Sequence, residues 1–163
     1  MPVELYRIDD RLIHGQVVVG WGQPLNIRLL VLVDDIVAAS EWEQELYRMA
    51  VPPEMEIRFE SVDSAALAHE QYAADQRKSI FVVADIDTMQ RLIARVPSIG
   101  AVNLGGLHHR AGRAQKLRYV FLTADEEGKL RDLAAAGVTV TAQDVPSASI
   151  VPLDELLSGE AAA

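Results

Sequence analysis

Two short apolar runs constrain the fold of this chain more than any other feature: Arg28–Val33 (RLLVLV) and Ser79–Ala84 (SIFVVA). A strand that is apolar on both faces is typical of a parallel sheet covered by helices on both sides. Further strands are expected at Val3–Ile8, Met55–Ser61, Ala101–Leu104, Arg118–Thr123 and Val138–Ala142.

Amphipathic segments lie between these strands. Helices are expected within Leu12–Leu25, Ile36–Ala50, Ser64–Ala74, Asp87–Val96 and Asp125–Ala136. The alternation predicts an α/β fold with a single open, mostly parallel twisted sheet of about six to seven strands and helices on both faces. The 163 residues suit one domain over residues 1–163. Residues 153–163 are expected to form a short helix and a loose tail.

Composition excludes several classes of site and disfavours several classes of partner. The chain has no cysteine, which excludes disulfides, thiol catalysis and cysteine-based metal sites. A formal net charge of −9 disfavours nucleic acid or an anionic membrane as the main partner. Because the sequence has neither a signal peptide pattern nor an apolar run of the ~20 residues that span a bilayer, a cytoplasmic protein is expected. No apolar surface stripe that would indicate self-association is evident.

A charged stretch, Tyr6–Val17 (YRIDDRLIHGQV), follows the first expected strand. Ligands of open α/β sheets bind beyond the carboxyl ends of the strands, so this stretch lies at the expected ligand edge. His14 is a candidate nucleophile, and Arg11 offers a guanidinium suited to phosphate oxygens. Gly15 permits close backbone approach. The stretch His108–Lys116 follows a later strand and is expected at the same edge.

The residues alone also allow a purely structural interpretation of each of these two stretches. The charges of the first stretch can pair with one another, and Asp9 and Asp10 can orient the arginines or cap a helix. His108 and His109 form either a polar loop or, with Arg110 and Arg113, a second phosphate-binding loop. Their spacing disfavours a metal site. Three residues are assigned structural roles: a surface position for His69, a helix cap for Asp34, and a core or interface position for Trp42.

The motif also supports a family assignment. The run RIDDRLIHGQV, followed by Gly20 and Trp21, resembles the active-site signature of the IIB subunits of the bacterial phosphoenolpyruvate-dependent sugar phosphotransferase system, in the mannose/fructose/sorbose family. The resemblance continues in order along nearly the whole chain, through Leu30–Ala39, Met49–Pro52, Asn103–Leu107 and Asp144–Pro146.

The resemblance implies a phosphotransferase that carries a phosphoryl group on Nδ1 of His14. The group would come from a phosphohistidine on a separate IIA protein and pass to a sugar held by membrane-embedded IIC and IID subunits. The residue matching Arg11 binds the phosphoryl group in that family. The remaining phosphate-site candidates are Gly15, Asp10 as an orienting residue, and Arg7 and Arg110 as supports.

No metal or cofactor is expected, and no nucleic acid partner. The family also implies a cytoplasmic location at the inner face of the membrane through IIC and IID, and it is compatible with a homo-oligomer. Two other hypotheses remain at this point: a regulatory phosphohistidine protein without transport, and a non-covalent small-anion-binding α/β module. The sugar is not encoded in this chain, because the membrane subunits make most of its contacts.

Overall fold

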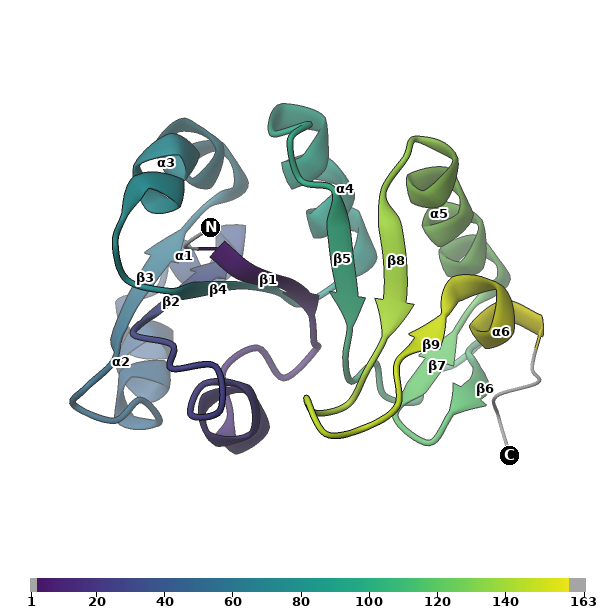
Figure 1. Ribbon diagram of the computed structural model, residues 1–163, viewed down its shortest axis with the longest axis horizontal. Coiled ribbons are helices and arrows are strands. Elements are labelled where there is room, and N and C mark those ends of the chain that lie inside the picture. Colours follow the sequence, from purple (N-terminus) through teal and green to yellow (C-terminus); the bar gives the residue numbers. More distant parts are fainter. Residues whose placement is uncertain (1–2, 159–163) are drawn as a thin grey trace.

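The computed structural model describes residues 3–158 and contains a seven-stranded sheet in the order β3-β2-β4-β1-β5-β8-β9 (Figure 1). All the strand pairs in this sheet are parallel except β8 with β9. The prediction of a mostly parallel open sheet is therefore confirmed. Its strands are β1 (Val3–Ile8), β2 (Leu29–Val33), β3 (Glu56–Glu60), β4 (Ser79–Val83), β5 (Ala101–Leu104), β8 (Thr139–Ala142) and β9 (Val151–Pro152).

The two apolar runs form β2 and β4, and every residue of both strands is buried. Successive side chains of a strand point to opposite faces, so each run contributes to two cores. Val31 and Phe81 belong to one apolar cluster, whereas Leu32 and Val82 belong to the other. This division explains why both runs lack the polar alternation of a half-exposed strand.

Helices cover both faces. The cluster containing Val31 is covered by α3 (Val62–Ala74), α4 (Ile86–Arg95) and α5 (Ala124–Ala135), which line the upper side of the sheet in Figure 1. The other face is packed against the π-helix η1 (Gln16–Trp21) and against α1 (Asp35–Ala38) and α2 (Glu41–Met49). The expected cap is confirmed, since Asp34 accepts hydrogen bonds from the amides of Ile36 and Val37.

Three expected elements differ from the structure. The strand expected at Arg118–Thr123 is β7 (Val120–Leu122), which pairs with β6 (Ala114–Leu117) in a separate antiparallel hairpin. The helix expected over Ile36–Ala50 is broken into α1 and α2, because Ser40 is extended and caps α2 through the amide of Glu43. Within Leu12–Leu25 only η1 is helical.

The exposed face of α2 corrects two expectations. Trp42 is 69% exposed, and Leu46 and Met49 are exposed beside it at helical spacing, so Trp42 is not a core residue and an apolar surface stripe does exist. The apolar period of Trp42, Leu46 and Met49 lies on the solvent side of the helix rather than against the core. Packing of α2 rests instead on Tyr47, which contacts the cluster beneath it.

The C-terminal region adds β9 and α6 (Leu153–Ser158), with Leu153 and Leu156 buried. The tail expected beyond this helix, residues 159–163, lies outside the described residues. Within residues 3–158, none of the helices has the length and apolarity needed to cross a bilayer.

Strand order fixes where a ligand site belongs. From β1 the chain moves to β2 on one side of the sheet, whereas from β5 it continues to β8 on the other. The carboxyl ends of β1 and β5 therefore flank the switch in strand order, where open α/β sheets bind ligands.

Candidate functional site

The charged stretch after β1 is held at this switch point by the neighbouring strands. The amide of Asp9 donates to the carbonyl of Val83 at the end of β4, and the amide of Asp10 donates to Gly106 after β5. Leu12 adopts a φ of 57°, which leucine rarely does, and its amide closes the turn on the carbonyl of Asp9. Backbone strain of this kind is characteristic of functional sites.

His14 follows this turn with its side chain 16% exposed. Its Nε2 is shielded from solvent and lies 3.2 Å from Oδ2 of Asp9, a fully buried carboxylate, within ion-pair distance but not aligned as a hydrogen bond. A carboxylate at Nε2 favours the tautomer that carries its proton there. The lone pair of the neutral ring then resides on Nδ1, which is the nitrogen available to a reagent.

Asp9 is held in turn by Arg7, whose side chain is completely buried on β1. Nε and Nη2 of Arg7 donate to Oδ2 of Asp9 at 3.4 and 3.2 Å. The rest of the guanidinium donates to acceptors from three other parts of the chain: Asn103 Oδ1 (2.5 Å), Gln16 Oε1 (3.1 Å) and the carbonyls of Gln143 (3.0 Å) and Asp144 (3.2 Å).

Close packing confines the same guanidinium. Its central carbon lies 5.2 Å from the centroid of the Trp21 ring. On another side it contacts Gly105, where an added Cβ would come within 2.3 Å of Nη2. All the donors of Arg7 point at protein acceptors and its side chain is completely buried, so its contacts hold Asp9 in place.

The electrostatics of Asp9 follow from these contacts. Burial alone would raise its pKa, but the adjacent His14 ring, the charge of Arg7 and the amide of Arg11 together hold the pKa below its ordinary value. Asp9 is therefore ionised at neutral pH. A fixed negative charge behind Nε2 stabilises the positive charge that the ring acquires when Nδ1 is substituted.

Asp10 points away from His14 and binds the second loop. Its carboxylate accepts from the amide of His108 at 2.8 Å and lies 2.6 Å from His108 Nδ1. The expected meeting of the two loops at one edge of the sheet is thus observed. Arg113 of the second loop is occupied elsewhere, since it forms a two-point ion pair with Glu126 on α5.

Two exposed arginines remain beside this buried framework. Arg11 and Arg110 have exposed side chains, and neither guanidinium has an acidic partner within residues 3–158. Gly15 has a right-handed helical backbone, and nothing lies within 4 Å of the position that a Cβ would occupy. Open space beside Gly15 and two exposed cations on the loops after β1 and β5 leave a surface that a phosphoryl group or an acidic partner can approach.

Sequence reasoning missed the framework behind His14. Asp9 was considered only beside Asp10 as an orienting or capping group. Three more contributors were not singled out: Gln16, Asn103 and Asp144, of which Gln16 donates to Asp144 Oδ1 at 2.7 Å. Asn103 lies near the carboxyl end of β5, and Asp144 lies just beyond the carboxyl end of β8. Their place at the same edge of the predicted sheet as His14 is the signal that could have identified them.

Comparisons with known proteins identify the family. Residues 3–163 match the family model of the PTS system sorbose subfamily IIB component. The chain is 31% identical over 158 residues to the N-acetylgalactosamine-specific phosphotransferase enzyme IIB component 2 of Escherichia coli, covering 96% of this chain and 100% of that protein. It is 28% identical to the mannose-specific EIIAB component of Escherichia coli, covering 97% of this chain but 49% of that protein.

A solved structure of a relative has the same fold as this chain. The IIBSor domain of the sorbose permease from Klebsiella pneumoniae superposes with a TM-score of 0.86 at 28% identity, covering 97% of this chain and 98% of that one. With a family model that spans almost every residue, the assignment no longer depends on the histidine motif alone. The chain belongs to the sorbose-subfamily IIB components of the phosphotransferase system.

Proposed function

We propose that this protein is a phosphocarrier that accepts a phosphoryl group on Nδ1 of His14 and passes it to a sugar. The observation that carries the proposal is the position of the shielded Nε2, 3.2 Å from the buried Asp9 carboxylate, because this charge favours a proton on Nε2 and a lone pair on Nδ1. The donor is a phosphohistidine on a IIA protein. The acceptor is a sugar bound by IIC and IID membrane subunits, to which this IIB chain docks from the cytoplasm.

Transfer to His14 is an in-line displacement. The Nδ1 lone pair forms a bond to phosphorus as the donor's N–P bond breaks, and the bonding pair stays on the donor imidazole. The His14 ring becomes cationic and keeps its proton on Nε2 against Asp9. Arg11, with Arg110 in support, offsets the charge on the equatorial phosphoryl oxygens, since positioning and charge stabilisation supply most of the catalysis in such reactions.

In the second transfer, His14 is the phosphoryl donor and the sugar is the acceptor. A sugar hydroxyl oxygen bonds to phosphorus, the Nδ1–P bond breaks with its electron pair returning to His14, and the hydroxyl proton leaves to a base on the acceptor side. His14 is then neutral again. Because two partners must reach the same nitrogen in turn, an open surface at Gly15 suits the chemistry better than an enclosed pocket would.

The direct test is phosphorylation in vitro. The protein is incubated with phosphoenolpyruvate, the general phosphotransfer proteins and a IIA protein, and peptides are mapped by mass spectrometry under alkaline conditions. We expect one acid-labile phosphoryl group on the peptide containing His14. Reversible phosphate binding in calorimetry with no covalent adduct would instead identify an anion-binding module.

Replacing each of the two neighbouring aspartates by asparagine distinguishes their roles. Asp9→Asn removes the charge behind Nε2, and we expect phosphoryl transfer to slow on the order of 10²-fold, the low end for positioned acid–base groups. Asp10→Asn keeps a side chain that can bind the amide of His108, so we expect a much smaller loss. Rapid-quench transfer rates from phosphorylated IIA check both, and equal losses would refute the assignment of Asp9.

A further inference from the structure

A second cavity lies between the same two strands, β1 and β5, away from His14. The strands pair only at their carboxyl ends, at Arg7 with Asn103 and Ile8 with Leu104, whereas β1 pairs with β4 along its length. The amino-terminal halves of β1 and β5 therefore splay apart. The opening is a cleft of about 540 Å³, a volume typical of small-molecule sites.

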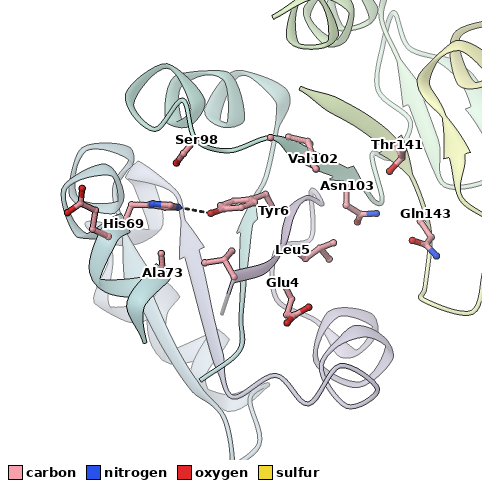
Figure 2. Close-up of a pocket in the computed structure, with 14 residues that line it drawn as sticks. Glu4, Leu5, Tyr6, His69, Ala73, Ser98, Val102, Asn103, Thr141 and Gln143 are labelled. Carbon is pink, nitrogen blue, oxygen red and sulfur yellow. Dashed lines mark hydrogen bonds between the residues drawn. The ribbon is translucent and has the colours of Figure 1, made fainter. Parts of the chain in front are cut away.

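The cleft has an apolar body. Figure 2 shows the Tyr6 ring extending towards His69 of α3, with Val102 of β5 on the other side. Tyr6, His69 and Phe81 form an aromatic cluster with centroids 5.3–6.0 Å apart, so the Tyr6 ring is a rigid surface. The hydroxyl of Tyr6 is hydrogen-bonded to Nε2 of His69 at 2.6 Å. His69 is therefore buried rather than the surface residue that was expected.

The Tyr6–His69 pair is uncharged at neutral pH. Burial raises the pKa of Tyr6 to about 12, and burial lowers the pKa of His69 against the opposing charge of Glu70. The charged residues lining the described part of the cleft are Glu4 and Glu70, with no lysine or arginine among them. Lys78 lies 4.0 Å from the Glu4 carboxylate, at the limit of an ion pair.

This charge distribution favours cationic ligands over anionic ones. Two exposed carboxylates at the rim of a mostly apolar cleft repel anions, including phosphate esters, and attract a cation. An aromatic face inside the cleft favours the same charge through its π-electrons. We infer that the cleft between β1 and β5 binds a small organic cation, an amine with an apolar or aromatic body, at a site separate from His14.

Three probes of matched shape test this inference: phenethylamine, phenethyl alcohol and hydrocinnamate, which carry a positive charge, no charge and a negative charge. Each is titrated into the full-length protein labelled with nitrogen-15. We expect phenethylamine to shift the amide resonances of Tyr6, His69 and Asn103, phenethyl alcohol to bind about fivefold more weakly, and hydrocinnamate to cause no shift.

Two variants complete the test. Glu4→Gln combined with Glu70→Gln is expected to raise the Kd of phenethylamine about fivefold or more while leaving that of phenethyl alcohol unchanged. The paired change Glu45→Gln with Glu54→Gln, away from the cleft, is the control and should have no effect. Shifts outside the cleft, equal binding of all three probes, or an unchanged Kd in the double variant would each overturn the inference.

Discussion

Replacing His14 by glutamine is expected to abolish phosphorylation of this protein completely. The amide of glutamine can still reach the Asp9 carboxylate, but it has no nitrogen lone pair able to attack phosphorus. The side chain of His14 is only partly buried, and among the described residues its Nε2 lies beside the Asp9 carboxylate without forming a hydrogen bond. We therefore expect the free energy of unfolding to change by less than about 1 kcal/mol.

The measurement is the intact mass after incubation with phosphorylated IIA protein, read beside a urea unfolding curve. His109→Gln is the matched control, since His109 is exposed on the second loop and packs edge-on against Phe121. This control should carry the phosphoryl group as the unmodified protein does. Label retained in His14→Gln, or lost in His109→Gln, would place the acceptor elsewhere.

Replacing Arg7 by methionine is expected to lower the free energy of unfolding by about 3–5 kcal/mol. Methionine fills much of the volume but leaves the buried Asp9 carboxylate without its cation. It also removes the donor to Asn103 and to two carbonyls after β8. Uncompensated charge in a closed site costs far more than the loss of an exposed ion pair.

Urea denaturation provides the measurement, with Arg118→Met as the control. Arg118 pairs with Asp144 on the surface, where such a pair contributes about 1 kcal/mol or less. Adding Asp9→Asn to Arg7→Met should restore part of the lost stability, because the orphaned charge is removed together with its partner. A double variant that is less stable than Arg7→Met would contradict this account of the buried pair.

The sheet was predictable because its signals are local. Continuous apolar runs at β2 and β4 could form only doubly covered strands, and their alternation with helices fixed a parallel arrangement. The errors occurred where local pattern and tertiary context disagree. Trp42 has the spacing of a core helix but faces solvent. His69, which stands among Ala66, Leu67 and Gln71 in the sequence, lies under Tyr6.

The candidate site shows the same contrast between local sequence signals and tertiary context. His14, Arg11 and Gly15 stand together in sequence, so one motif indicated them. The partners of Arg7 are separated from it by up to 137 residues, and a single sequence carries no signal of that distance. Asp9 and Asp10 are adjacent and chemically identical, and only the folded backbone, with its contacts to β4 and to Gly106, shows that Asp9 is the one beside His14.

The cage around Arg7 also has a consequence for protein synthesis. The acceptors at Gln143 and Asp144 are synthesised 136 and 137 residues after Arg7, the side chain that they enclose. A nascent chain on the ribosome exposes His14 long before those acceptors emerge. The enclosure of Arg7 and Asp9 can therefore be completed only after β8 and the segment that follows it have been synthesised.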